Sequence, residues 1–289
     1  MSKKNKFETN AIHVGNKPDS STGSISPPIH LTSTFVQDGI GKNKGFDYSR
    51  GTNPTRERLE KNIASLEGGY DAIAFSSGMA ATTALLQHLK QGDHIIISRN
   101  VYGGTYRMTT QVLSNHGLKF DFVDTTDTQK IKEAIKPETK WVFIETPTNP
   151  MLEVTDISAV SKICKEGNIK FAVDNTFMSP FGQRPIEHGA DCVMHSTTKF
   201  IGGHSDVLGG VLVAKDKELS DKLHFIQKSG GAIPSPFDAW LLLRSVKTLG
   251  MRVQKASDNA MVIAKYFDSN SKIAKTIYPG LESHPQNSI

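Results

Sequence analysis

The chain has 289 residues, of which 37% are hydrophobic and 22% are charged, and its formal net charge is +5 at pH 7. This composition is typical of a soluble globular protein, and the length suffices for one large domain with an appendage. The basic residues are scattered and form no known nucleic-acid-binding motif, so we expect no nucleic-acid partner.

The N-terminal segment MSKKNKFETN is charged and leads into no apolar stretch, so we expect no signal peptide. No window approaches about eighteen consecutive apolar residues, so we expect no membrane-spanning helix and no membrane partner. Cys164 and Cys192 lie far apart in the sequence, as is typical of buried thiols in a reducing compartment. The protein is therefore expected to be cytoplasmic.

The elements follow in chain order. Residues 1–50 are rich in Gly, Ser, Pro and polar residues and are predicted to form an extended arm. A helix should start at Asn53, with Pro54 in its first turn. Apolar runs then alternate with helical patterns, and these runs are AIAF, HIIIS, FDFV, WVFIE, FAVD, DCVMHS and GGVLVA. Apolar strands separated by helices predict an α/β domain with a mostly parallel sheet covered on both faces.

The C-terminal part begins with SPFDAWLLLRSVKTLG, which predicts a long helix capped by Ser235 and running to about Tyr266. A turn at 278–280 follows, and the sequence ends at Ile289. We expect an arm at 1–50, an α/β large domain at 51–250, and at 251–289 the end of the long helix with the start of a truncated C-terminal domain.

Ligands of such sheets bind beyond the carboxyl ends of the strands. The segments that follow the predicted strands are Ser76–Met79, Tyr102–Gly104, Glu145–Pro150, Asp174–Thr176 and Ser196–Lys199. The sequence SSGMAA places small residues at a helix start, where free N–H groups favour an anion such as phosphate. Nucleotide-binding fingerprints of the GxGxxG and GxxxxGK[ST] types are absent from the sequence.

Each of these features also has a simpler explanation. SSGMAA could be an ordinary turn, Asp174 could cap a helix, and Lys199 could be a surface lysine. The combination of a lysine, a phosphate cradle and an acid at a buried strand end favours pyridoxal 5′-phosphate (PLP). Lys199 would hold the cofactor aldehyde as a Schiff base, and Asp174 would keep the pyridine nitrogen protonated.

The motifs YSRGTNPTR, SSGMAA, VYGGTYR, ETPTNP, VDNTF and HSTTKFIGGHSD occur in one order along the chain. In this respect the sequence resembles the Cys/Met-metabolism family of fold-type-I PLP enzymes, which includes cystathionine γ-lyase, γ-synthase and β-lyase and methionine γ-lyase. SGGAIPSPFDAWLLLRSVKTL and YPGLESHPQ look closest to the cystathionine γ-lyases. The resemblance implies a PLP-transferase-like large domain and PLP as the cofactor.

The resemblance also implies roles for individual residues. Lys199 is expected to carry the cofactor and to move protons, Asp174 to pair with the pyridine nitrogen, and Tyr102 to stack on the ring and help activate the substrate amine. The residues expected to bind the phosphate are Gly78, Met79, Ser196 and Thr198. Tyr102 could instead be a packing residue.

Four further residues are implied to act at the substrate or between subunits. Tyr48 and Arg50 are expected to reach the phosphate of a neighbouring subunit, which makes a dimer the catalytic unit and a dimer of dimers the expected homotetramer. Asn149 is expected near the ring oxygen of the cofactor or the substrate carboxylate, and Arg107 at the substrate entrance. Arg50 could instead form a surface ion pair.

The implied reaction is γ-elimination of cystathionine to cysteine, 2-oxobutanoate and ammonia, with γ-synthase and β-lyase activity as alternatives. Methionine γ-lyases carry a cysteine where this chain has Gly104, which argues against methionine as the main substrate. Relatives continue into a small domain that supplies an arginine for the substrate carboxylate, so an oligomer-forming, catalytically impaired fragment is a further alternative. The spacing of His188, His195 and His204 fits no metal site, and no metal is expected.

Overall fold

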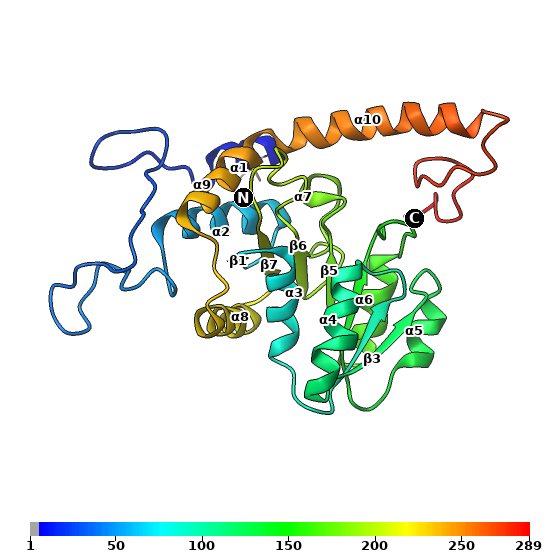
Figure 1. Cartoon of the computed structure of the whole chain (residues 1–289), viewed down its shortest axis with the longest axis horizontal. Coiled ribbons are helices and arrows are strands. Elements are labelled where there is room, and N and C mark those ends of the chain that lie inside the picture. The colour runs from blue at the N-terminus through cyan, green and yellow to red at the C-terminus, as the bar shows by residue number, and fades with distance from the viewer. Residues whose placement is uncertain (1–5) are drawn as a thin grey trace. The chain divides into compact units, whose positions relative to one another are not determined.

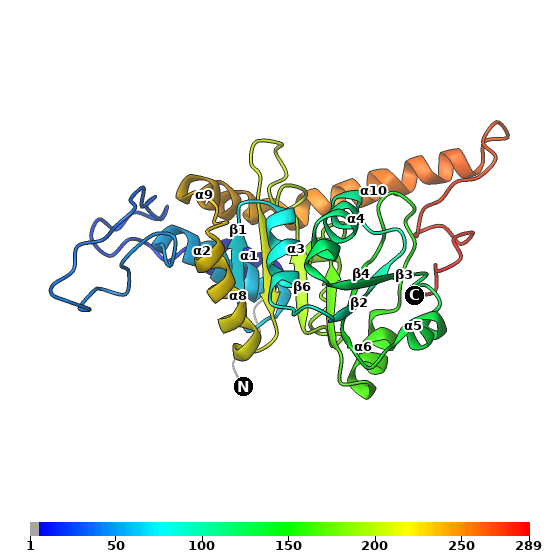
Figure 2. The ribbon, with the colours of Figure 1, turned by 60° about the horizontal axis from the view of Figure 1, so that its bottom comes forward.

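The computed structural model describes residues 6–289, which form two compact units. One unit contains the residues up to His88 together with Met194–Gly250. The other unit contains Leu89–Val193 together with Met251–Ile289. Figure 1 shows the ribbon with its labelled elements, and Figure 2 shows it from a second direction.

All seven apolar runs of the sequence form strands. They are β1 (Asp71–Phe75), β2 (His94–Ser98), β3 (Lys119–Val123), β4 (Thr139–Glu145), β5 (Lys170–Asp174), β6 (Cys192–His195) and β7 (Gly210–Ala214). The helices are α1 (Phe7–His13), α2 (Pro54–Glu67), α3 (Gly78–Gln87), α4 (Gly103–Gln111), η1 (Leu113–His116), α5 (Thr128–Ala134), α6 (Ile157–Glu166), α7 (Ser179–Gly182), α8 (Lys217–Gly230), α9 (Pro236–Ser245), η2 (Val246–Thr248) and α10 (Leu249–Asp268).

The unit that contains Leu89–Val193 has four strands that pair in parallel, in the order β5-β4-β2-β3. Figure 2 shows α4 on one side of these strands and α5 and α6 on the other. This placement follows from right-handed crossovers, because the chain moves outward from β2 to β3 and then back to β4 and β5. All five residues of β2 are buried, as expected for a strand covered on both faces.

The other unit holds β1 and β7 as an antiparallel pair, with β6 next to β7. Because β1 is an edge strand, part of its backbone has no neighbouring strand to bond. Side chains of α2 and α8 replace that neighbour. Ala74 N–H donates to Glu60 Oε1 at 2.9 Å, and the Ala74 carbonyl accepts from Gln227 Nε2 at 2.6 Å. The sheet and its helices together confirm the predicted α/β fold.

Helix α2 begins as the sequence predicts, because Asn53 Oδ1 accepts from the backbone N–H of Thr55 at 2.9 Å and Pro54 is the first helical residue. Within the predicted arm, the sequence did not indicate the short helix α1. Its Ala11 is buried, and Asn62 of α2 donates its side-chain amide to the Val14 carbonyl at 2.8 Å. This contact ties the start of the chain to α2.

The predicted long helix from 235 to about 266 is wrong as a single element. It starts at the predicted cap, where Ser235 Oγ accepts from Asp238 N at 3.1 Å, but α9 ends at Ser245. The 3-10 turn η2 then precedes α10, and Thr248 Oγ1 donates to the Ser245 carbonyl at 3.2 Å. A serine or threonine hydroxyl bonded to a helix carbonyl competes with the regular α-helical pattern.

No helix in the part of the chain that the structure describes is long and apolar enough to cross a membrane. The cytoplasmic location stays a prediction from the sequence.

Candidate functional site

Lys199 lies on a tight turn directly after β6. Its backbone N–H donates to the Ser196 carbonyl at 3.2 Å, and its own carbonyl accepts from Gly203 N at 2.7 Å. The lysine side chain is exposed, and among residues 6–289 no carboxylate forms an ion pair with it. The turn therefore presents an ammonium group on a backbone that is fixed by hydrogen bonds.

The start of α3 lies against this turn. Ser77 caps the helix by accepting from Ala80 N at 3.1 Å. A Cβ atom on Gly78 would come within 2.8 Å of Ser196 Cβ, so only glycine allows this approach. The N–H groups of Gly78 and Met79 precede the first intrahelical hydrogen bond, and with the helix dipole they favour an anion. Gly78, Met79 and Ser196 thus fit a phosphate group.

Thr198 is partly engaged by the start of β7. Its Oγ1 accepts from Gly209 N at 3.1 Å and donates to the Gly209 carbonyl at 3.3 Å. To donate to a phosphate oxygen, this hydroxyl would have to give up its 3.3 Å hydrogen bond to the Gly209 carbonyl. At the next residue, a Cβ on Gly210 would lie 2.1 Å from the Ser77 carbonyl oxygen, so β7 also packs closely against the start of α3.

The three histidines considered as metal ligands bond to protein groups. His195 Nε2 lies 2.5 Å from Glu67 Oε1, and both side chains are buried. His204 Nδ1 lies 2.7 Å from a backbone carbonyl, and His188 Nδ1 lies 3.2 Å from Ser158 Oγ. Within the described residues, no group of three His, Cys, Asp or Glu side chains could hold a metal ion.

Asp174 ends β5 and lies in the unit that contains Leu89–Val193. Its side chain is buried, and Oδ1 accepts from the backbone N–H of Thr176 at 3.0 Å. The residue paired with it on the neighbouring parallel strand β4 is Glu145, which is buried as well. Two carboxyl groups therefore occupy adjacent positions at the ends of two strands.

Glu145 is the strand partner of Asp174 and also binds the backbone at Tyr102 and Asn149. Its Oε2 accepts from Tyr102 N at 2.6 Å, and its Oε1 accepts from Asn149 N at 2.8 Å. Burial raises the pKa of Glu145 to about 8, and the nearby charge of Asp174 acts in the same direction. Sequence reasoning gave Glu145 no role, although it ends an apolar run in the same way as Asp174.

The side chains predicted to meet a substrate are exposed in this unit. Tyr102 is the residue before α4 and is 45% exposed, and Arg107 lies further along the same helix with its side chain in solvent. Asn149 is also exposed. The backbone N–H groups of Tyr102 and Asn149 thus bind the same carboxylate, and Arg107 lies on α4, which begins directly after Tyr102.

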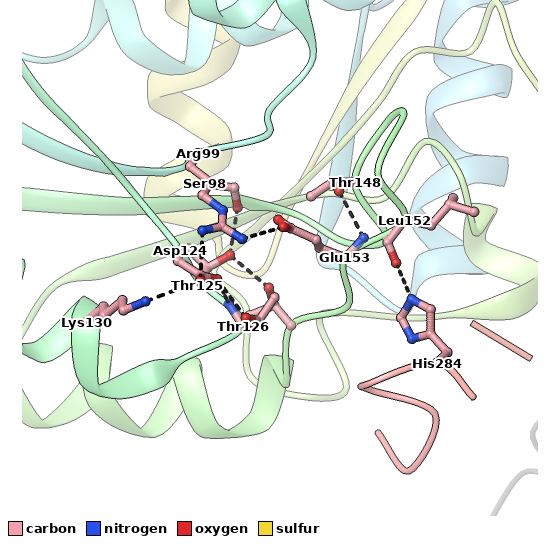
Figure 3. A network of polar contacts seen from close by, with 11 residues as sticks. Ser98, Arg99, Asp124, Thr125, Thr126, Lys130, Thr148, Leu152, Glu153 and His284 are labelled. Atoms are coloured by element: carbon pink, nitrogen blue, oxygen red, sulfur yellow. Dashed lines mark hydrogen bonds and ion pairs between the residues drawn. The ribbon is translucent and has the colours of Figure 1, made fainter. Parts of the chain in front are cut away.

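The turn that carries this asparagine is held by polar contacts from several segments, which Figure 3 shows. Arg99, at the end of β2, contacts Glu153 at 2.6 Å and Asp124 at 3.0 Å. From the C-terminal segment, His284 Nε2 donates to the Leu152 carbonyl at 3.1 Å. The exposed asparagine therefore lies on an anchored turn.

Tyr48 and Arg50 lie in the arm, in the unit that contains α8. Arg50 Nη1 donates to the Lys228 carbonyl at 2.5 Å, and its guanidinium carbon lies 5.3 Å from the centre of the Tyr48 ring. Both side chains are exposed. Their expected contact with a neighbouring subunit stays a prediction.

The chain is similar to known proteins along nearly its whole length. A family model described as Cys/Met metabolism PLP-dependent enzyme matches residues 8–289. A probable cystathionine gamma-synthase of Herpetosiphon aurantiacus is 49% identical over 283 residues, which cover 98% of this chain and 89% of that protein. A cystathionine beta-lyase of Coxiella burnetii is 45% identical over 289 residues, which cover 99% and 75%.

A solved structure gives the same result. The cystathionine gamma-lyase from Lactobacillus plantarum, complexed with L-serine, superposes with a TM-score of 0.96 at 44% sequence identity. The superposition covers 98% of this chain and 74% of that one.

Proposed function

The chain belongs to the Cys/Met metabolism PLP-dependent enzymes, and from this membership we propose that it eliminates the γ-substituent of cystathionine. The products would be cysteine, 2-oxobutanoate and ammonia. Membership in this family confirms the cofactor predicted from the sequence. It also confirms that the protein is an enzyme whose substrates are free amino acids, which are small molecules. The specific reaction is the proposal.

The observation that carries the proposal is the environment of Lys199. An exposed lysine that has no carboxylate partner among residues 6–289, on the turn whose Ser196 packs against Gly78, suits covalent attachment of a phosphate-bearing aldehyde. When bound, PLP supplies an electron sink for the carbanion of the substrate. We propose that Lys199 Nζ is the attachment point and that the start of α3, with Ser196 and Thr198, binds the phosphate.

The remaining roles concern charge and protons. Asp174 would pair with the cationic ring nitrogen, because a carboxylate and a cation form a strong charge-assisted pair in a buried site. Lys199 Nζ would carry protons between the carbon atoms of the substrate. Tyr102 would stack on the ring and help activate the substrate amine. Asn149 would bind the ring oxygen or the substrate carboxylate, and Arg107 would face the incoming amino acid.

Two features support γ-elimination of cystathionine. Gly104 stands where methionine γ-lyases carry a cysteine, and the C-terminal motifs look closest to cystathionine γ-lyases. The second candidate is cystathionine γ-synthase activity, in which cysteine replaces the acyl group of an O-acylhomoserine. The relative that is 49% identical supports this candidate, since it is named a probable cystathionine gamma-synthase. β-elimination is the third candidate.

We also propose that the protein assembles as a dimer of dimers and that Tyr48 and Arg50 complete the site of a neighbouring subunit. Exposed apolar side chains on the arm support this assembly, and they are Ile25, Leu31, Val36 and Ile40. Arg50 would exchange its contact with the Lys228 carbonyl for the phosphate of the other subunit.

A product assay tests the proposed reaction. The full chain, loaded with PLP, is incubated first with cystathionine and then with an O-acylhomoserine plus cysteine. The proposal expects 2-oxobutanoate and cysteine in the first incubation, with loss of activity in Lys199→Ala and normal activity in Lys215→Ala, a matched exposed lysine. Pyruvate and homocysteine in the first incubation would indicate a β-lyase. Cystathionine formed in the second incubation, with no breakdown of cystathionine in the first, would indicate a synthase. No 2-oxo acid in either incubation would overturn the lyase assignment.

A further inference from the structure

The carboxyl groups of Glu145 and Asp174 form a buried pair at the ends of two neighbouring strands. The two residues are partners in the parallel register of β4 and β5, and each is only 5% exposed. Neighbouring strands lie about 4.8 Å apart, and paired residues point to the same face of a sheet. The two side chains therefore extend from one edge of the sheet in the same direction.

Two negative charges on such a pair are unfavourable. Burial disfavours the charged form of a carboxyl group, and a second carboxylate close by disfavours it further. Other groups around Glu145 in this unit do not neutralise it. Tyr102 contributes a phenol from the start of α4, and Ser98 of β2 contributes an uncharged hydroxyl that accepts from Glu145 N at 3.2 Å. Arg99 is already paired with Asp124 and Glu153.

The proton of the pair belongs on Glu145. Burial, and then the charge of Asp174, raise the pKa of Glu145 to about 8, against the effect of the two backbone N–H groups that it binds. The proposed function also gives Asp174 a cationic partner, the ring nitrogen, whereas Glu145 faces backbone amides. A protonated carboxyl group keeps enough acceptor capacity for both of these N–H groups.

Glu145 also fixes the backbone on which the substrate-facing side chains lie. Its two oxygens bind the N–H before α4, at Tyr102, and the N–H in the turn after β4, at Asn149. These residues lie 43 and 4 positions from Glu145 in the sequence. One side chain thus sets the relative positions of two segments.

We propose that Glu145 is a positioning residue that holds the single proton of the Glu145–Asp174 pair and so keeps Asp174 ionised. With its two oxygens it also fixes the backbone at Tyr102 and Asn149. The proposal rests on the proposed function only for the ring nitrogen that Asp174 meets, and the paired carboxyl groups are a property of the cofactor-free chain.

The pH dependence of unfolding tests the proton. The pKa of a glutamate in the unfolded chain is about 4.3. At any pH between this value and a raised folded-state pKa, the carboxyl group is protonated in the folded chain and ionised in the unfolded chain. Stability due to Glu145 is therefore present at pH 4 and is lost as the pH rises to about 8. Glu145→Gln removes this loss, because glutamine stays neutral.

The measurement is the thermal midpoint of the full chain without added cofactor, from pH 5 to pH 9. The midpoint of Glu145→Gln minus that of the wild type should increase up to about pH 8 and then stay constant. The control is Glu138→Gln, an exposed carboxylate near the other end of β4 whose pKa is lowered by its hydrogen bonds and Lys119. The thermal midpoint of Glu138→Gln minus that of the wild type should be constant above pH 5. A constant difference for Glu145→Gln as well would overturn the proposal.

Asp174→Asn tests the coupling between the two carboxyl groups. Without the neighbouring charge, the pKa of Glu145 should fall, and the pH window of the Glu145→Gln effect should become narrower but should persist because burial remains. An unchanged window in the Asp174→Asn background would show that the two groups titrate independently, and the proposed pair would be wrong.

Titration with PLP, followed by its visible absorption, tests positioning. Glu145→Ala loses both hydrogen bonds and should weaken PLP binding by about tenfold or more, whereas Glu145→Gln keeps one acceptor and should lie between it and the wild type. Equal binding by all three proteins would overturn the positioning role. If PLP forms no reducible adduct with Lys199 but the pH signature is present, the proposed function is wrong and the carboxyl pair stands.

Discussion

The turn around Lys199 and the carboxyl pair at Glu145 and Asp174 are built by different means. Backbone hydrogen bonds and glycine contacts fix the lysine turn, and its charged group lies in solvent. At the second region, buried carboxyl groups accept backbone N–H groups and thereby fix the geometry themselves. A larger side chain at a glycine should therefore disturb the region around the lysine turn. A change of charge or of pH should instead disturb the carboxyl pair.

The largest effect is expected at the carboxyl pair. Asp174→Asn replaces a carboxylate by a neutral amide of the same shape, so the ring nitrogen would lose the anionic partner that we propose for it. Turnover should fall by about 100-fold or more, the scale of general acid–base effects, while the fold persists. Steady-state kinetics and circular dichroism check both parts. Asp121→Asn, an acid on β3 paired with Lys136, is the control and should keep its turnover. Near-normal turnover in Asp174→Asn would show that this acid does not maintain the electron sink.

Added volume beside the start of α3, against which the lysine turn packs, should disturb this region without any change of charge. Gly210→Ala places a Cβ 2.1 Å from the Ser77 carbonyl oxygen at the start of α3, so backbone has to move. We expect a loss of about 1–3 kcal/mol in the free energy of unfolding, measured with denaturant, and weaker PLP binding. Gly230→Ala is the matched control, because nothing lies within 4 Å of its Cβ. Equal stability of the two variants would contradict the close packing of β7 against α3.

The smallest effect is expected at the anchored turn shown in Figure 3. Arg99→Ala removes a partly exposed guanidinium from Glu153 and Asp124, and exposed ion pairs contribute only about 0.2–1 kcal/mol to stability. Because Glu145 still holds Asn149 N, the KM for cystathionine should change by less than about fivefold, the factor that corresponds to about 1 kcal/mol. Lys119→Ala, which removes the exposed pair with Glu138, is the control. A much larger KM change in Arg99→Ala alone would show that the ion pairs, rather than Glu145, position the asparagine.

Much of the fold could be predicted because its strands are short, continuous apolar runs. Runs such as HIIIS and WVFIE are buried throughout or nearly so, and Asn53 with Pro54 marks the start of α2 in the sequence itself. Helix α8 was not predicted, although a signal was present. Asp216 caps it, and Leu219 and Leu223 are buried at a spacing of four residues.

The candidate site shows where sequence reasoning ends. Lys199 and Asp174 could be found because each follows an apolar run. The role of Glu145 depends on the register between β4 and β5 and on a backbone N–H that lies 43 residues away in the sequence. Neither can be obtained from residue types or spacing. The break between α9 and α10 was missed for a similar reason, because a 3-10 turn interrupts the hydrogen bonds without interrupting the helical pattern of residues.

Every role proposed for this site depends on Lys199 as the residue that carries PLP. The most direct measurement is to load the full chain with PLP, reduce it with borohydride, digest it, and locate the modified lysine by mass spectrometry. We expect one modified peptide, carrying the cofactor on Lys199, in the wild type and in Asp174→Asn, and no modified peptide in Lys199→Ala. Modification of another lysine, or an unchanged adduct in Lys199→Ala, would show that Lys199 is not the residue that carries PLP.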